Sequence, residues 1–176
     1  MDDVTRREML ALLPRLRRFA YGLTGSVDEG DDLVQATCER AIRHIDTWQP
    51  GTRLDSWMYR IARNLFLNQI RANKVRGQYL EVAELDRHAS VDGARAAEAH
   101  VTLNAVRRFA ARLPEEQRSI MLLVCVEGLS YKEVSETLDL PMGTVTSRLA
   151  RARLALKTLM DGHGANAGAI DETVEP

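Results

Sequence analysis

The residues of this chain best suited to chemistry lie in the stretch LPMGTVTSRLARARLALKTL, residues 140–159. It contains four basic residues and several hydroxyl-bearing ones but no acid, and Pro141 and Gly143 near its start are typical of a turn. Guanidinium and hydroxyl groups at helical spacing can hold phosphates and reach base edges, so the pattern favours nucleic-acid binding. An amphipathic helix with a solvated basic face would have the same composition.

A second basic segment, residues 59–76, contains five basic residues and again no acid. The whole chain of 176 residues has a formal net charge of −1, which by itself argues against a partner made of nucleic acid. The acids are concentrated elsewhere, in residues 28–32, in residues 81–92 and in the C-terminal tail. This separation predicts local positive surfaces. Two ordinary solvated helix faces remain the alternative.

Motifs for catalysis are missing from the sequence. It has no glycine-rich phosphate loop, no Gly-x-Ser-x-Gly turn and no paired metal-ligand motif, and its four histidines are scattered. Cys38 and Cys125 lie among apolar neighbours, where filling the core is their simplest role. We therefore expect no catalytic residue, no metal, no cofactor and no small-molecule substrate.

The chain also lacks membrane and export signals. Acids precede the arginine-interrupted apolar residues at the N-terminus, unlike a signal peptide. No apolar run approaches the roughly 18–20 residues that span a bilayer. We expect a cytoplasmic protein without direct membrane insertion.

Apolar periodicity predicts an all-α protein with two small helical domains and a flexible linker between them. The N-terminal domain, residues 1–76, has helices expected at 4–23, 28–47 and 56–72, with Gly22 and Gly25 ending the first helix. The second helix has an apolar stripe that includes Ile42. Residues 77–93 are acidic, with glycine at both ends, and predict the linker. The C-terminal domain is expected at residues 94–160, followed by a disordered acidic tail at 161–176.

Within the C-terminal domain, residues 130–159 have the pattern of two helices joined by a short turn. Ser130 and Glu133 have the spacing of a capping box. Before them, a helix starting near Pro114 is expected to bury several apolar residues, Val126 among them. The pair of helices predicts a helix-turn-helix, whose second helix places its N-terminal residues in the major groove. The residues expected to face DNA are Met142, Gly143, Thr144, Thr146, Ser147, Arg148 and Arg151.

Two long stretches together resemble one family. LPEEQRSIMLLVCVEGLSYKEVSETLDLPMGTVTSRLARARLAL is similar to region 4 of bacterial sigma factors of the extracytoplasmic-function (ECF) group, and DDLVQATCERAIRHIDTWQPGTRLDSWMYRIARNLFLNQIRANKVR is similar to their region 2. The resemblance covers roughly residues 10–160. The short linker leaves no room for the region 3 of housekeeping sigma factors, which supports the ECF group.

The resemblance implies a dissociable subunit that directs core RNA polymerase to promoters. In that family, region 2 binds the clamp helices of the largest polymerase subunit and reads the −10 element. Region 4 binds the flap of the second-largest subunit and reads the −35 element. The residues matched to clamp binding are Asp31, Asp32 and Gln35. Those matched to the −10 element are Trp48, Gln49, Arg53, Leu54, Tyr59, Arg60, Arg63, Asn64, Asn68 and Arg71.

Some of these residues have a simpler explanation. Asp31 and Asp32 could stabilise the start of a helix, and Trp48 could pack against its own domain. Arg63 and Asn64 point about 100° apart on a helix, so we do not expect them to share a role. Which face of helix 56–72 would meet DNA stays open.

The sequence departs from the family pattern at two positions. Ser135 replaces a common alanine, so its hydroxyl needs a partner. Asp139 replaces a common glycine of the turn, and aspartate is among the residues that tolerate a positive φ.

Family resemblance further implies a controlling anti-sigma factor as a partner, beside RNA polymerase core and promoter DNA. Two alternatives remain. A sigma-like module could sequester an anti-sigma factor without initiating transcription, although such a mimic need not keep a basic recognition helix. A stand-alone helix-turn-helix repressor would leave the resemblance to region 2 unexplained.

Overall fold

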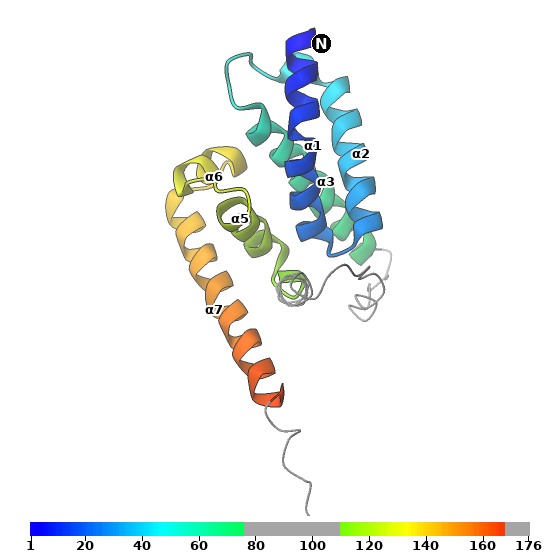
Figure 1. Ribbon diagram of the computed structural model, residues 1–176. Coiled ribbons are helices and arrows are strands. Elements are labelled where there is room, and N and C mark those ends of the chain that lie inside the picture. The colour runs from blue at the N-terminus through cyan, green and yellow to red at the C-terminus, as the bar shows by residue number, and fades with distance from the viewer. Residues whose placement is uncertain (76–109, 168–176) are drawn as a thin grey trace, which may run out of the picture.

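The computed structural model of the chain describes residues 1–75 and 110–167, with side chains placed for 1–74 and 110–158. The described residues are helical, with short connections, and form two halves (Figure 1). The predicted linker at 77–93 and the start of the predicted C-terminal domain lie outside the described residues. The all-α prediction is confirmed for the described part of the chain.

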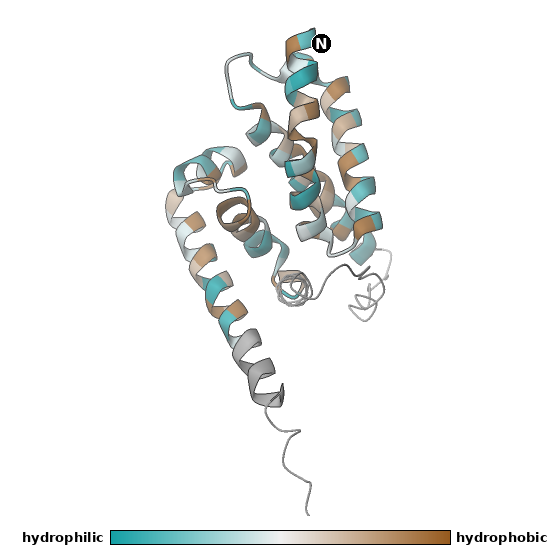
Figure 2. Ribbon diagram, viewed as in Figure 1, coloured by the Kyte–Doolittle hydropathy of each residue, from teal (hydrophilic) through white to brown (hydrophobic). Residues whose placement is uncertain are grey.

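Three helices form the N-terminal half: α1 (Asp3–Thr24), α2 (Val27–Arg43) and α3 (Leu54–Val75). A short 3-10 helix, η1 (Ile45–Thr47), follows α2. The side chain of Asp2 accepts a hydrogen bond from the backbone N–H of Thr5 and so caps α1. Brown and teal segments alternate along each helix in Figure 2, and apolar residues of all three helices are buried in the core.

Two expectations for this half were wrong in detail. Gly22 does not end α1, which continues to Thr24 and ends at Gly25, a residue with φ of 76°. Gly22 instead allows another helix to approach closely. Ile42 is 53% exposed, because α2 packs on its neighbours through Leu33 and Ala41, one face further round.

The C-terminal half consists of α5 (Glu115–Cys125), α6 (Tyr131–Leu138) and α7 (Met142–Ala167). The predicted capping box is confirmed: Ser130 Oγ accepts from the N–H of Glu133, and the Glu133 carboxylate accepts from the N–H of Ser130. Asp139 has a φ of 53° in the turn, as expected for the position that departs from glycine. Ser135 Oγ donates to the carbonyl of Leu140 at 2.5 Å, which supplies the partner its hydroxyl needs.

Two expectations for the C-terminal half were also wrong. Val126 is 47% exposed, because α5 ends at Cys125 and the turn that follows buries Glu127 instead. Residues 161–167 were assigned to a disordered tail, yet they continue α7. Each residue added to an existing helix gains a backbone hydrogen bond without a new nucleation cost, so the helix extends beyond its apolar stripe. The rest of the predicted tail, 168–176, lies outside the described residues.

The two halves pack against each other. Helix α1 contacts α5, and α3 contacts α6, while α7 extends away from the N-terminal half at its far end (Figure 1). One apolar cluster therefore runs through both halves, from Leu16 and Phe19 to Leu123 and Leu149. Within the residues that the structure describes, no helix is both long and apolar enough to cross a membrane.

Candidate polymerase and nucleic-acid interfaces

The three residues matched to clamp binding, Asp31, Asp32 and Gln35, are exposed on α2. Ser26 caps this helix through the N–H of Glu29, so the aspartates are not needed as its N-cap. Asp31 accepts a hydrogen bond from Tyr21 Oη at 2.8 Å and lies 3.4 Å from Arg17 Nε. These contacts leave a negative, solvated surface on one face of α2.

The segment between η1 and α3 contains the next predicted group. Trp48 is half-buried against the core, and its Nε1 is buried without a hydrogen-bond partner. Much of this side chain therefore packs against its own domain. Gln49 is exposed, and Leu54 is buried at the start of α3. Arg53 is bound on two sides, by Asp55 next to it and by Glu133 of the other half.

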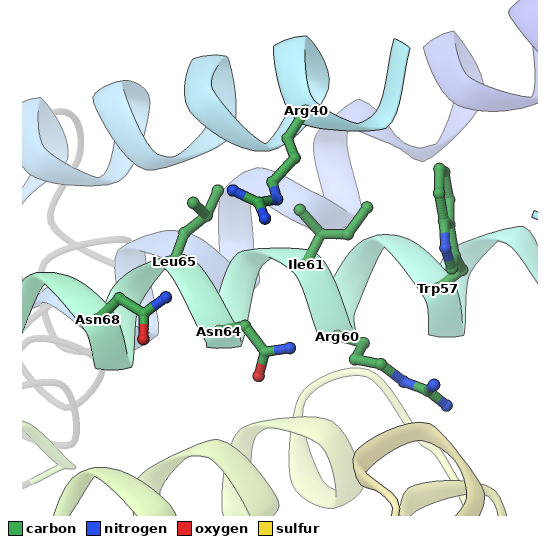
Figure 3. Close-up of a pocket in the computed structure, with 7 residues that line it drawn as sticks. All are labelled: Arg40, Trp57, Arg60, Ile61, Asn64, Leu65 and Asn68. Carbon is green, nitrogen blue, oxygen red and sulfur yellow. The ribbon is translucent and has the colours of Figure 1, made fainter. Parts of the chain in front are cut away.

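A small pocket of about 150 Å³ opens between α2 and α3 (Figure 3). Its polar groups come from Arg60, Asn64 and Asn68 of α3 and from Arg40 of α2. Trp57, Ile61 and Leu65 supply an aromatic and aliphatic wall. Amide and guanidinium groups beside an aromatic ring can pair with a base edge and stack on its face. The pocket therefore has the chemistry to hold an unstacked base, through Asn64, Asn68 and Arg40, while the Arg60 guanidinium donates to the carbonyls of Thr137 and Glu136.

Arg40 was missed by the sequence analysis. It precedes Asn64 by 24 positions and belongs to another helix, so spacing along the chain could not connect the two residues. Only the packing of α2 on α3 brings the two into one pocket.

Tyr59 and Arg63 lie on a different face of α3 from the pocket residues. Tyr59 is 1% exposed, packs edge-on against Phe19 at 5.0 Å and donates a hydrogen bond to Glu127 Oε2 at 2.6 Å. Burial and this hydrogen bond raise the pKa of Tyr59. Arg63 is 8% exposed, and burial lowers its pKa, a shift that the charge of Glu116 partly opposes. Both side chains are buried in this structure and are not accessible to DNA. Their predicted contact with the −10 element stays a prediction.

The N-terminal part of α7 presents most of the predicted −35 residues to solvent. Met142, Gly143, Thr146, Ser147 and Arg151 are exposed, whereas Thr144 and Arg148 are half-buried. The apolar residues Val145, Leu149 and Ala152 are buried on the opposite face, which confirms the amphipathic division expected for this helix.

Basic side chains gather around the start of α7. Arg148 Nη2 lies 2.6 Å from a carboxylate oxygen of Glu116 on α5. A groove of about 330 Å³ lies beside this pair, and its basic lining comes from both halves: Arg71 and Lys74 of α3, and Arg148 and Arg151 of α7. Arg71 and Arg148, which the sequence separates by 77 positions, therefore face one groove.

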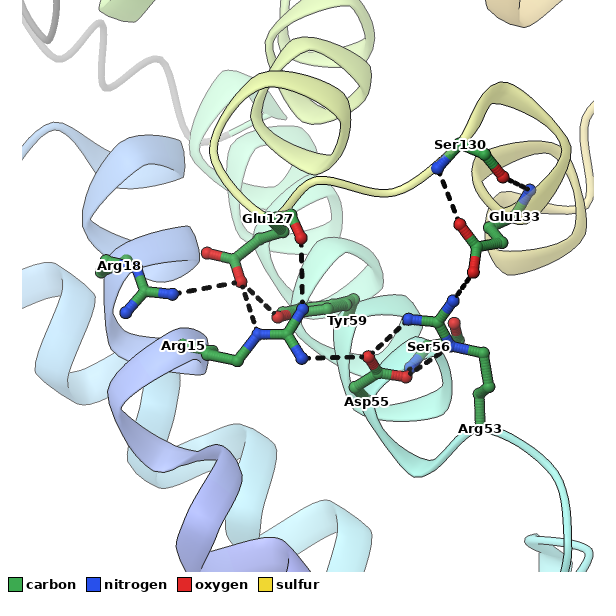
Figure 4. A network of polar contacts seen from close by, with 9 residues as sticks. All are labelled: Arg15, Arg18, Arg53, Asp55, Ser56, Tyr59, Glu127, Ser130 and Glu133. Atoms are coloured by element: carbon green, nitrogen blue, oxygen red, sulfur yellow. Dashed lines mark hydrogen bonds and ion pairs between the residues drawn. The ribbon is translucent and has the colours of Figure 1, made fainter.

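A network of charged residues connects the two halves (Figure 4). Glu127, whose side chain has no exposed surface, accepts from Arg15 Nε at 3.1 Å and lies 3.6 Å from Arg18 Nη2. Arg15 also contacts Asp55, which in turn binds Arg53. Sequence reasoning missed Glu127; the only available signal was a lone acid in the apolar run around Val126.

Comparison with known proteins places both halves in one family. Residues 9–76 match the family described as Sigma-70 region 2, and residues 103–156 match Sigma-70, region 4. The ECF RNA polymerase sigma factor EcfG of Rhodopseudomonas palustris is 36% identical over 99% of this chain and 94% of its own length.

Two solved structures are similar in fold. Sigma factor RpoE of Bartonella quintana, solved in complex with the anti-sigma factor NepR, matches with a TM-score of 0.73 and 28% identity over 91% of this chain and 98% of its own. The anti-anti-sigma factor PhyR of the same organism matches with a TM-score of 0.59 and 21% identity over 88% of this chain and 49% of its own. The likeness to PhyR concerns the fold alone. The matches across regions 2 and 4 and along nearly the whole of EcfG show that this chain belongs to the sigma-70 family, in its ECF group of RNA polymerase sigma factors.

Proposed function

We propose that this chain binds core RNA polymerase and directs it to a promoter class, with the N-terminal half reading the −10 element and the C-terminal half reading the −35 element. The observation that carries the proposal is the start of α7 in a helix-turn-helix, with Thr146, Ser147 and Arg151 exposed, in the same chain as a small pocket between α2 and α3. The helix-turn-helix and the pocket lie on different halves of the chain, which fits a protein that reads two DNA elements.

Two parts of the N-terminal half contribute distinct chemistry to this function. The exposed acids Asp31 and Asp32 on α2 supply a negative surface for the clamp helices of the polymerase, although Asp31 already contacts Tyr21 and Arg17 within the chain. The pocket between α2 and α3 would hold a base extruded from the −10 element. The energy of stacking and hydrogen bonding there offsets the few kcal/mol that unstacking a base costs.

We also propose that an anti-sigma factor controls this chain. Support comes from the Bartonella quintana sigma factor, which was solved with NepR bound and matches along nearly all of its length. A sigma mimic that only sequesters such a factor is the second candidate, since PhyR shares the fold. The mimic has no need of exposed Thr146, Ser147 and Arg151 on α7, and their presence favours a DNA-binding sigma factor.

The deciding experiment is run-off transcription with purified core RNA polymerase on a library of genomic promoter fragments. We expect specific transcripts with the chain present and none with core alone. Failure to bind core, together with the absence of specific transcripts, would rule out the sigma function. Binding to an anti-sigma factor without transcripts would select the mimic.

The substitution Arg148→Ala tests the −35 assignment. If Arg148 reads a base, binding should weaken by about 1–3 kcal/mol and sequence preference at one position should relax. If it holds a phosphate, binding should fall evenly across sequences and the salt slope should drop by about one. Electrophoretic mobility shifts over a range of salt concentrations distinguish the two results.

Lys157→Ala is the matched control, because Lys157 is an exposed base further along α7 that we expect to stay in water. Equal behaviour of the two variants would place Arg148 outside the DNA interface.

A further inference from the structure

The groove beside Arg148 is bordered by basic residues from two helices. Its volume of about 330 Å³ is at the small end of the range for pockets that hold small molecules. Its basic residues are Arg71 and Lys74 of α3, and Arg148 and Arg151 of α7. The two members of each pair are three positions apart, so they project from one face of their helix. Two basic helix faces therefore border one groove.

The acids of the groove do not cancel its positive charge. Glu115 and Glu116 of α5 also line it, so four basic residues face two acids and leave a formal charge of +2. Each acid already has a basic partner. Glu115 Oε1 lies 3.8 Å from Lys74 Nζ, and Glu116 Oε2 lies 2.6 Å from Arg148 Nη2. The other basic residue of each pair has no carboxylate within ion-pair distance among the side chains that the structure describes.

A fifth guanidinium lies close to these charges. Arg63 is 8% exposed and precedes Arg71 by about two turns on the same face of α3. Burial lowers the pKa of Arg63, and the positive charges of Arg148 and Arg71 lower it further, against the opposing effect of Glu116. Its Nε is buried with no hydrogen-bond partner among the described residues. Guanidinium groups of both halves therefore repel one another here, and an anion would relieve that repulsion.

The start of α5 contributes backbone groups to the same groove. Pro114 is the N-cap of this helix, and no described side chain caps it. The groove is lined by Pro114 and by the first turn of the helix, residues 115–117. The first N–H groups of a helix lack partners within it and lie at the positive end of its dipole, so they favour anions. The uncapped helix start and the four basic side chains therefore favour the same kind of ligand.

The arrangement selects for a ligand with several linked anionic groups. The remaining lining residues, Leu67 and Ile70, carry no polar side-chain atom, so charge and hydrogen bonds to the basic residues must supply recognition. Guanidinium and ammonium groups bind phosphate oxygens through charge-assisted hydrogen bonds. Phosphates joined in one molecule can contact both basic pairs at once, and each contact raises the effective concentration for the next.

We propose that this groove binds an oligophosphate, a chain of two or more linked phosphates, held at one end by the two basic residues of α3 and at the other by those of α7. Inorganic polyphosphates and the phosphate chains of nucleotides share this chemistry. The formal charge of the whole protein is −1, so the groove and not a general attraction must supply the affinity. The site goes beyond promoter reading and requires neither DNA nor polymerase.

Isothermal titration calorimetry of the unchanged full chain tests the site. Tripolyphosphate should bind at least about tenfold more tightly than orthophosphate at matched ionic strength, because only the linked phosphates reach both basic pairs. Equal affinities for the two would overturn the proposal. Adenosine triphosphate distinguishes the sources of the ligand. Affinity equal to that of tripolyphosphate would assign recognition to the phosphate chain alone, and tighter binding would add a contact of the nucleoside with the apolar lining.

One arginine from each half tests whether both halves hold the ligand. Arg71→Gln and Arg151→Gln should each weaken tripolyphosphate binding by about tenfold, the scale of a lost hydrogen bond to a charged group. Arg43→Gln is the matched control, because it makes the same change in net charge at an exposed position of α2 outside the groove. A loss confined to Arg151→Gln would place the ligand on the helix-turn-helix alone and overturn the shared site.

A change of opposite sign separates the groove from general electrostatics. Glu116→Gln removes the carboxylate that competes with phosphate for Arg148, so it should strengthen tripolyphosphate binding several times. Glu8→Gln, at an exposed position of α1, makes the same change in net charge and should have a much smaller effect. Equal effects of the two glutamine variants would contradict the site.

The outcome is independent of the sigma function. No step of these titrations uses DNA or polymerase, so a chain without run-off transcripts can still bind tripolyphosphate, and an active sigma factor can fail to bind it. The comparison of tripolyphosphate with orthophosphate uses the unchanged chain and therefore tests the proposal even where a variant is unstable.

Discussion

At the scale of single residues, Asp55 shows how the start of α3 is held. Burial raises its pKa, but hydrogen bonds from Arg53 and from the N–H of Ser56, with the positive charges of Arg53 and Arg15, outweigh that effect and lower the pKa below its usual value. The charged carboxylate therefore stabilises the folded state. It joins Arg15 of α1 to Arg53 ahead of α3.

The substitution Asp55→Asn should lower the free energy of unfolding by about 1–3 kcal/mol near pH 7, the scale of hydrogen bonds to a charged group. A group with a lowered pKa stabilises the fold above its unfolded pKa of about 3.9, and that contribution is lost as pH falls through the folded pKa. The difference between variant and wild type should thus shrink in acid. Urea unfolding at a series of pH values measures it.

Asp46→Asn, at an exposed acid of η1, is the control and should change stability little at any pH. A constant difference between Asp55→Asn and the wild type down to pH 3 would contradict the explanation by charge.

At the scale of an element, α7 has Gly143 in its first turn, although glycine is a poor helix former. A Cβ on Gly143 would meet nothing within 4 Å, so packing within the chain does not require glycine there. Glycine costs up to about 1 kcal/mol in a helix relative to alanine. Close approach of the backbone to DNA is a reason for keeping it.

Gly143→Ala should therefore raise the unfolding free energy by up to about 1 kcal/mol. The added methyl group should weaken −35 binding by about 1–3 kcal/mol, the scale of one base contact. Thermal unfolding and mobility-shift titration of the same protein give both numbers. Unchanged DNA binding would show that the backbone at this residue stays away from the groove.

Gly30→Ala is the contrasting control in another helix. Its Cβ would lie 2.1 Å from Tyr21 Cδ1 and 3.3 Å from Tyr21 Cα, so α1 and α2 would have to separate. Overpacking of this kind costs about 1–3 kcal/mol, so Gly30→Ala should lower the unfolding free energy, whereas Gly143→Ala should raise it.

At the scale of the whole molecule, Arg118 joins parts that are distant in sequence. It is 8% exposed and donates to the carbonyls of Leu23, Ala111 and Leu113, the last at 3.1 Å. Its guanidinium also lies 5.9 Å from the ring centre of Phe66 on α3. One side chain therefore links α1, α3 and α5.

Arg118→Met should keep the aliphatic packing but leave these carbonyls without a donor. We expect a loss of about 1–3 kcal/mol, because buried carbonyl oxygens are left without a donor. The wild type should unfold in one calorimetric transition, and the variant in two, as the halves lose their coupling. Differential scanning calorimetry tests this, with Lys132→Met on the exposed face of α6 as the control.

A single transition at an unchanged temperature for Arg118→Met would show that the apolar contacts between α1 and α5 suffice to couple the halves.

Local chemistry allowed several features to be predicted. The capping box of Ser130 and Glu133, the positive φ of Asp139 and the amphipathic division of α7 all depend on residues a few positions apart. Predictions failed where the burial of a residue depends on how neighbouring helices pack. Val126 and Ile42 were assigned to the core by periodicity, yet both are exposed, because periodicity cannot say which face of a helix another helix covers.

The sequence by itself determined the helices, the helix-turn-helix and the resemblance to sigma regions 2 and 4, since these depend on motifs and short-range spacing. Only the tertiary structure placed Arg40 in the pocket beside Asn64, buried Glu127 between α1 and α3, and brought Arg53 and Arg60 against α6. Those contacts join residues 24 to 112 positions apart. Chain spacing says nothing about such pairs, because packing alone decides which helix faces meet.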